Sequence, residues 1–173
     1  MDDSFFIYLE QLELLLFFPA YPLIYLLIRA IAESSLSKKI FKKNISTLLP
    51  YAYALVGILY LGFLLKNFYP DYSFSHISAS TKIPALKIWG LLSILFFIPA
   101  VAKKPVYSLL HSLVFIFFIL RDLYFYLFKN SDKSLLKNDM SLYTYSILIN
   151  IGALFLVLAI ALLYSKSQSK KTA

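Results

Sequence analysis

The chain contains no cysteine and only two histidines among its 173 residues. The absence of cysteine excludes disulfides, thiolate metal sites and cysteine nucleophiles. The two histidines, His76 and His111, lie too far apart for a paired-histidine motif. The sequence also has no glycine-rich phosphate loop and no His, Asp and Glu cluster with ligand spacing. We therefore expect neither a metal nor a cofactor.

Charged residues are also scarce, because they make up 15% of the chain whereas hydrophobic residues make up 60%. The mean hydropathy is +0.74, which lies outside the range of ordinary soluble domains. The formal net charge is +8, but the basic residues cluster in loops beside apolar segments rather than along one helix face. This pattern argues against nucleic acid as a partner and leaves membrane lipid.

Five long apolar stretches predict an all-α, polytopic integral membrane protein. Each is longer than the ~18 apolar residues that distinguish a membrane span, and roughly 20 residues cross the ~30 Å hydrocarbon layer. Residues 113–120 are apolar at every position, which does not fit the alternation of a β-barrel. We expect one membrane domain, 1–173, a bundle of about five transmembrane helices with no soluble domain. The expected spans are 5–31, 45–65, 84–102, 105–128 and 142–164.

The distribution of lysine and arginine predicts the orientation, because short cytoplasmic loops retain positive charge. Basic residues are dense in 29–43, at Lys103 and Lys104, and in the tail 166–171, which share one side of a five-span arrangement. The opposite side includes Asp139 and is close to neutral. We expect the N-terminus outside and the C-terminus in the cytoplasm. Aromatic residues typical of the interface fall near the expected outer ends: Trp89, Tyr124, Tyr126, Tyr143 and Tyr145.

Polar residues within the expected spans gather at one depth in this arrangement. Glu10 and Glu13 are three residues apart and share a helix face, so both can meet Lys87 or Arg121 from neighbouring spans. Ionisable groups in a membrane are costly and mark functional hypotheses. Three roles stay open: structural ion pairing or snorkelling, contact with a partner subunit, and proton or ion handling. The predicted cluster is Glu10, Glu13, Lys87, Arg121, Asp122 and Asn150.

His111 lies near the inner end of the fourth expected span, between Ser108 and Ser112. It shares a face with Asp122, because eleven residues advance almost three helical turns, and a proton relay is one hypothesis. The other is a structural hydrogen bond to a neighbouring helix. A Ser-His-Asp hydrolase is excluded because Asp122 would lie ~16 Å along the axis from His111. We expect no enzyme activity.

Prolines and small residues predict how the spans bend and pack. Pro19 and Pro22 predict a kink in the first span, and Pro99 a bend or end of the third. Each frees backbone carbonyls that neighbouring helices must satisfy. Small residues allow close helix approach and place the second and fifth spans at the centre. They are Ala52, Ala54, Gly57, Gly62, Ser146, Gly152 and Ala153.

The segments Pro50–Gly57, Asn67–Asp71, Lys87–Gly90 and Ala102–Val106 resemble small bacterial inner-membrane proteins. The resemblance implies a multi-pass protein of the bacterial cytoplasmic membrane and carries no activity with it.

The expected function is a non-enzymatic accessory subunit of a larger membrane complex with other integral membrane subunits. Five spans with little mass outside the membrane present a lipid-embedded surface and little soluble chemistry. A proton-motive-force-driven energy transducer or secretion motor is the kind of complex expected, with the acidic first span as its docking face. One alternative is a small channel or ion-coupled transporter that uses Glu13, Asp122 and His111. A second is a lipid-modifying membrane enzyme.

Overall fold

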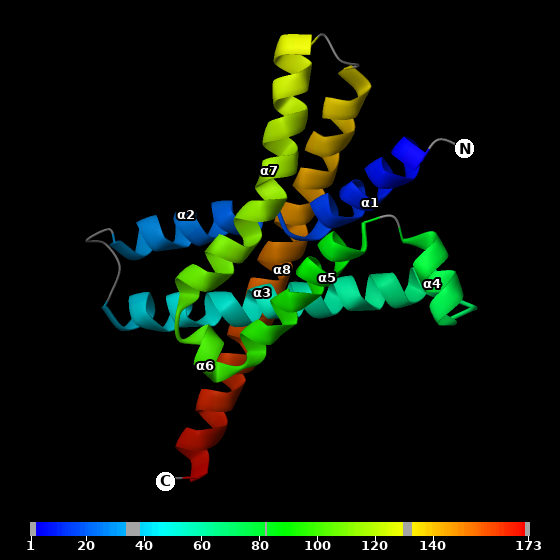
Figure 1. Ribbon diagram of the computed structural model, residues 1–173. Helices are drawn as coiled ribbons and strands as arrows, with labels where there is room; N and C mark the ends of the chain where they lie inside the picture. Colours follow the sequence, from blue (N-terminus) through cyan, green and yellow to red (C-terminus); the bar gives the residue numbers. More distant parts are fainter. Residues whose placement is uncertain (1–2, 34–38, 82, 130–132, 172–173) are drawn as a thin grey trace.

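The computed structural model describes residues 3–33, 39–81, 83–129 and 133–171. Within these ranges some side chains are not described, and that of Asp122 is one of them. These residues form helices and short connections, and no strand occurs in them (Figure 1). The all-helical class is thus confirmed. Within the described ranges, four rather than five segments are long and apolar enough to cross a membrane. They are Glu10–Ile31, Ile45–Phe68, Pro105–Phe125 and Lys137–Ser167.

The first apolar segment is broken where the prolines predict a kink. Helix α1 (Asp3–Phe17) ends before Pro19, and α2 (Tyr21–Glu33) begins two residues after it. Proline has no N–H and clashes with the preceding turn, so the α-helical hydrogen bonds cannot continue. The Tyr21 N–H donates to the Phe18 carbonyl at 3.2 Å instead of to that of Phe17. The Phe17 carbonyl is thereby left for another partner.

The second apolar segment is one long helix, α3 (Lys39–Phe68), which passes through Pro50 without a break. It starts earlier than the expected span, so Pro50 lies inside the helix rather than in its first turn. A short helix, α4 (Phe74–Ser80), follows, and its first turn is capped by the Ser73 hydroxyl, which accepts from the His76 N–H at 3.3 Å.

The expected third span, 84–102, is not one helix. Ile98 is extended (φ −72°, ψ 120°), as expected for a residue before proline, so the helix cannot continue into Pro99. The Ser93 hydroxyl donates to the Gly90 carbonyl at 2.6 Å, competing with the helical backbone pattern. Its continuous apolar part, Pro84–Phe97, is shorter than the spanning segments. The pieces are α5 (Pro84–Leu92), the 3-10 helix η1 (Ser93–Phe97) and α6 (Pro99–Ala102).

The chain ends in two long helices, α7 (Pro105–Lys129) and α8 (Lys133–Lys171). The 39 residues of α8 rise roughly 58 Å, about twice the hydrocarbon thickness. Because α8 begins well before the expected position 142, Asp139 lies within a helix and is fully buried. Asp139 is thus a buried helical residue, and its assignment to the outer side of the membrane stays a prediction.

The helices surround a core that is contributed mainly by α1, α2 and α3. In Figure 1, α3 lies beside α2 and crosses α8 rather than running along it. The spanning windows of the first segment and of α3 are 56% and 50% buried, against 18% for α7 and 17% for α8. The expectation that the fifth span is central is therefore wrong, whereas the second span is central. The largest fully buried side chains are aromatic: Phe18, Tyr21, Tyr53, Tyr60 and Phe115.

Gly57 allows α3 to approach η1 closely. A Cβ atom at this position would overlap the Ser93 hydroxyl oxygen and would lie 3.2 Å from the Ile94 backbone nitrogen. Gly62 and Gly152 have nothing within 4 Å of such an atom among the described residues. Only one of these three glycines is therefore needed for packing inside the part of the chain that the structure describes.

Candidate functional site

The middle of α1 gathers polar side chains from other helices of the protein. Within the described residues, α1 side chains between positions 8 and 13 receive partners from α3, α5, α7 and α8. We call this arrangement the polar collar. It pairs Tyr8 with Asp139, Glu10 with Lys87, Gln11 with Arg121, and Glu13 with Lys87 and Asn67.

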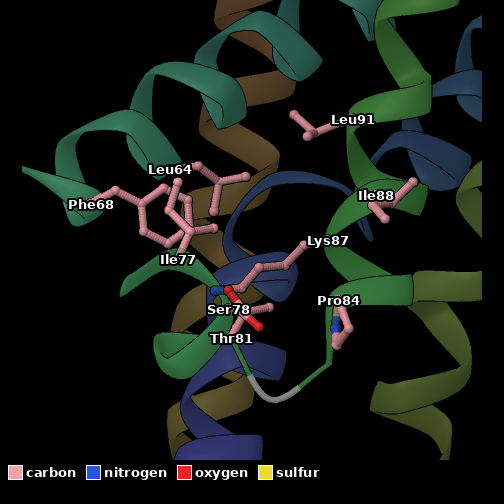
Figure 2. A pocket seen from close by; sticks show the side chains of 9 residues that line it. All are labelled: Leu64, Phe68, Ile77, Ser78, Thr81, Pro84, Lys87, Ile88 and Leu91. Carbon is pink, nitrogen blue, oxygen red and sulfur yellow. The ribbon is translucent and has the colours of Figure 1, made fainter. Parts of the chain in front are cut away.

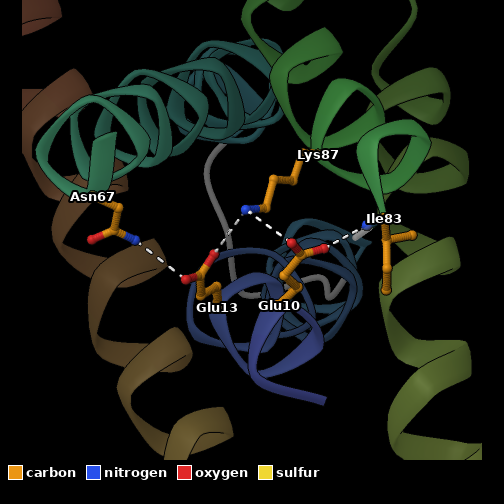
Figure 3. A network of polar contacts seen from close by, with 5 residues as sticks. All are labelled: Glu10, Glu13, Asn67, Ile83 and Lys87. Carbon is orange, nitrogen blue, oxygen red and sulfur yellow. Dashed lines mark hydrogen bonds and ion pairs between the residues drawn. The ribbon is translucent and has the colours of Figure 1, made fainter. Parts of the chain in front are cut away.

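Lys87 lies between the two carboxylates of α1 (Figure 3). Its Nζ atom is 3.4 Å from Oε1 of Glu10 and 3.7 Å from Oε2 of Glu13. The lysine side chain is 11% exposed, and those of Glu10 and Glu13 are 6% and 24% exposed. Two carboxylates that share a helix face thus meet one ammonium group from α5, as their spacing permits. The cluster holds one negative charge more than its lysine neutralises.

Two further contacts fix the carboxylates. Oε2 of Glu10 accepts the Ile83 backbone N–H at 2.6 Å, directly before α5 begins (Figure 3). Ile83 has no side-chain cap of its own, so Glu10 supplies the acceptor, and its charge is favourable at a helix N-terminus. The Asn67 amide donates to Oε1 of Glu13 at 3.2 Å. The cluster therefore joins α1, α3 and α5.

Arg121 contacts Gln11, the residue that follows Glu10 on α1. Its Nη2 atom donates to Oε1 of Gln11 at 2.7 Å, and its guanidinium lies 5.4 Å from the centre of the Phe118 ring. The Tyr8 hydroxyl donates to Asp139 at 3.4 Å on another side of α1. The structure therefore places Arg121 at the depth of Glu10, with a different partner. The predicted site residue Asp122 has its side chain outside the described part, so its role stays a prediction.

Asn150 lies at the break between α1 and α2 rather than in the polar collar. Its amide donates to the freed Phe17 carbonyl at 2.6 Å and to the Ser146 carbonyl of its own helix at 2.9 Å. The Ser146 hydroxyl accepts the Ala20 N–H at 3.3 Å. Ser146 and Asn150, one turn apart on α8, thus satisfy the backbone groups that Pro19 disrupts.

His111 forms a second polar site, which is held by Tyr53 and Trp89. Its Nε2 atom lies 2.9 Å from the Trp89 carbonyl, and its Nδ1 atom lies 2.7 Å from the Tyr53 hydroxyl. A carbonyl only accepts, so Nε2 carries the proton, and Nδ1 accepts from Tyr53. The Trp89 indole N–H donates to the His111 carbonyl at 3.2 Å, and the two rings stack at 4.8 Å. Both nitrogens of a neutral imidazole are thereby satisfied.

This contact shows that the depths expected for Trp89 and His111 are incompatible with each other. Straight antiparallel helices joined at Lys103 and Lys104 would place Trp89 opposite Phe118. The broken segment α5–η1–α6 places it opposite His111 instead, roughly two helical turns away. Because the rings of Trp89 and His111 are stacked, Trp89 cannot lie at an outer end while His111 lies near an inner end.

Replacing Tyr53 with Phe is expected to lower the free energy of unfolding by roughly 1–2 kcal/mol, because Nδ1 of His111 would lose its donor in a buried site. The emission of Trp89, the only tryptophan, should shift in the same variant because its stacking partner is no longer fixed. Unfolding in detergent, followed by this fluorescence, measures both effects. Tyr124→Phe on an exposed face of α7 is the matched control and should change neither.

Aromatic rings separate the polar collar from His111. Phe17, one turn after Glu13, contacts Tyr60 at 5.4 Å between ring centres, and Tyr60 contacts Phe18 at 5.2 Å. Phe18 in turn contacts Tyr53 at 5.9 Å. Two of these residues carry hydroxyls: that of Tyr53 contacts His111, and that of Tyr60 is buried without a hydrogen-bond partner among the described residues.

The other histidine, His76, lies in the first turn of α4, directly after the loop that carries Asp71 and Ser73. The Asp71 carboxylate accepts the backbone N–H of Ser73 at 2.9 Å and its hydroxyl at 3.0 Å. These hydrogen bonds hold the pKa of Asp71 below its usual value. Over the ranges that the structure covers, no group of three His, Cys, Asp or Glu side chains is placed to hold a metal ion.

No protein-family model, curated protein or solved structure matches this chain. Its function has to be argued from the geometry of its own residues. Two observations matter most: the carboxylates of α1 point inward to partners, and α7 and α8 leave most of their apolar surface exposed.

Proposed function

We propose that this protein is a non-enzymatic accessory subunit of a larger assembly in the bacterial cytoplasmic membrane. The outer face of α8 is the surface that contacts another integral membrane subunit. A proton-motive-force-driven energy transducer or secretion motor remains the kind of assembly in which we would look for it. The argument rests on α8, whose spanning window is only 17% buried although it is the longest helix in the described residues.

The exposed face of α8 has the composition of a helix interface. Leu148, Phe155 and Leu162 recur every seven residues and are 62%, 68% and 68% exposed. Gly152 and Ala159 lie between them on the same face and are also exposed. Small residues let helix backbones approach closely in lipid, where the hydrophobic effect does not drive association. A glycine also weakens a helix by about 1 kcal/mol relative to alanine, so its open position here favours an interface with a partner helix.

The polar collar supports an internal role for α1. Glu10, Lys87 and Asn150 are at most 9% exposed, and each has a partner inside the protein. The sequence predicts the docking surface on the acidic first segment, whereas we propose that it lies on α8. Ion pairing within the protein becomes the proposed role of Glu10, Glu13 and Lys87.

A five-span topology, with the N-terminus outside and the C-terminus cytoplasmic, is part of the proposal. In Figure 1 the start of α1, α4 and the junction of α7 with α8 lie toward the upper and right-hand side. The end of α2, the start of α3, α6 and the end of α8 lie toward the lower and left-hand side. The basic residues of α2, of the first turns of α3, at 103–104 and at the end of α8 thus gather toward one side, which supports a cytoplasmic location for it. The broken segment α5–η1–α6 would be the third crossing.

Affinity purification at native expression tests the subunit proposal. In mild detergent, the wild type is expected to co-elute with at least one other integral membrane protein. Gly152→Leu should reduce that co-elution at least about tenfold, because a large side chain on an open helix face blocks close approach without a clash inside the protein. Mass spectrometry of the eluate measures the loss.

Gly62→Leu is the matched control, since Gly62 on α3 also has open space around its Cβ position. It should leave co-elution unchanged. A wild-type protein that elutes alone and monodisperse would contradict the proposal, as would equal co-elution of the Gly152→Leu variant. Recovery of a second copy of this chain only would indicate a homo-oligomer instead.

The channel or transporter alternative requires a water-accessible route through Glu13, Asp122 and His111. The rings of Tyr60, Phe18 and Tyr53 pack against one another between these residues, so such a route would have to use the Tyr60 and Tyr53 hydroxyls. Liposome flux by the wild type that is lost in Glu13→Gln would favour this alternative. The lipid-enzyme alternative would need lipid turnover that depends on His111 or Asp122.

A further inference from the structure

A pocket of about 330 Å³ lies between α3, α4 and α5, on the other side of Lys87 from the helix α1 (Figure 2). Most of its wall is apolar. Figure 2 shows Lys87 extending toward Ser78 and Thr81, so the polar groups gather at one end. The apolar lining residues are Leu64, Phe68, Ile77, Pro84, Ile88 and Leu91.

The polar end of the pocket offers hydrogen-bond donors. The Thr81 hydroxyl oxygen is buried and has no hydrogen-bond partner among the described residues. The Lys87 ammonium group has three N–H donors. It contacts the carboxylates of Glu10 and Glu13 and lies over the ring of Phe68. Lys87 and Thr81 both line the pocket, so a ligand there lies beside an ammonium group and beside a hydroxyl that donates once the Thr81 side chain turns toward it.

Charge restricts the ligand further. Glu10 and Glu13 already place two carboxylates against the one ammonium of Lys87. A third anion at this position would add repulsion in a region of low dielectric, where unpaired charge is costly. The polar group that fits is an uncharged hydrogen-bond acceptor attached to an apolar chain.

We infer that the pocket binds part of one acyl chain of a membrane glycerolipid, with its ester carbonyl at Thr81 and Lys87. The volume is at the lower end of the range for ligand pockets, which suits a single chain rather than a bulky ring system. The ester carbonyl is the neutral acceptor that lies next to the chain in such a lipid. This site stands apart from the proposed partner surface on α8.

Photo-crosslinking in vesicles tests the inference. The full chain is reconstituted in phosphatidylcholine with a trace of diester phosphatidylcholine that carries a mid-chain diazirine, and labelled peptides are identified by mass spectrometry. Labelling is expected within residues 77–91. Ile88→Trp fills the pocket from a position that is 58% exposed and should remove most of this labelling. Leu162→Trp on α8, 68% exposed, should leave it unchanged.

The polar end is tested with Thr81→Val, which keeps the shape of the side chain and removes the donor. The wild type should label about fivefold more from the diester lipid than from its diether twin, as expected for one hydrogen bond, and the variant should lose this preference. Labelling confined to the exposed faces of α7 and α8, or unchanged in Ile88→Trp, would overturn the acyl site. Equal labelling of the wild type by the two lipids would overturn the role of the ester. Strong competition by a free fatty acid would overturn the charge argument.

Discussion

Replacing Lys87 with methionine is expected to lower the free energy of unfolding by about 3–5 kcal/mol. The change puts an apolar side chain of similar length in place of the lysine and removes the ammonium group that lies between Glu10 and Glu13. Removing one partner of a buried ion pair is costly because the remaining charge stays desolvated. Equilibrium unfolding in mixed micelles, followed by circular dichroism, measures the loss.

Neutralising the two carboxylates should reverse most of this loss. Glu10→Gln and Glu13→Gln, added to the Lys87→Met variant, leave no buried charge in the cluster. Lys66→Met is the control, because Lys66 is exposed near the end of α3, and it should stay within about 0.5 kcal/mol of the wild type. If Lys87→Met unfolds like the wild type, the lysine reaches the headgroup region instead of pairing, and the structural role of the cluster is wrong.

Replacing Gly57 with alanine is expected to lower the free energy of unfolding by about 3 kcal/mol, at the upper end for an overpacked core. The new Cβ would overlap the Ser93 hydroxyl and press on the Ile94 backbone. The hydroxyl cannot rotate away freely, because it donates to the Gly90 carbonyl. The separation of α3 and η1 would have to increase. The same mixed-micelle unfolding experiment detects this change.

Two further variants isolate the cause. Gly62→Ala changes the same residue type on the same helix, but its Cβ has open space, so helix propensity should stabilise it by up to about 1 kcal/mol. Ser93→Ala in the Gly57→Ala background removes the overlapping atom and should recover part of the loss. Equal stability of the Gly57→Ala and Gly62→Ala variants would show that η1 does not pack on α3 as described.

Much of the fold follows from the sequence because apolar length and proline act locally. Pro19 and Pro99 each remove a backbone donor, so a break near them could be predicted from the sequence, although α3 shows at Pro50 that a proline need not end a helix. The break near Ser93 also depends on a side-chain hydrogen bond and on space beside Gly57. Such tertiary conditions are not visible in hydropathy, so the sequence predicts the bend at Pro99 but not the break near Ser93.

The polar partners depend on packing in the same way. The spacing of Glu10 and Glu13 identified a shared face, but nothing local distinguishes Lys87 from Arg121 as their partner. Gln11 was overlooked because an uncharged polar residue between two glutamates gives a weak signal. Two polar residues one turn apart on an apolar helix, here Ser146 and Asn150, form the sequence pattern that indicates unpaired backbone groups on a neighbouring helix.

The hydrogen bond from Asn150 to the Phe17 carbonyl joins residues 133 positions apart in the chain. During synthesis, the Phe17 carbonyl at the break between α1 and α2 is therefore present long before Asn150, its hydrogen-bond donor, has been translated. A backbone carbonyl without a partner is unfavourable in hydrocarbon, so the nascent chain would be held near the insertion machinery or in a hydrated setting until α8 arrives. Correct assembly therefore requires the complete chain. A product truncated before α8 would keep the Phe17 carbonyl unpaired and would expose this defect to membrane quality control.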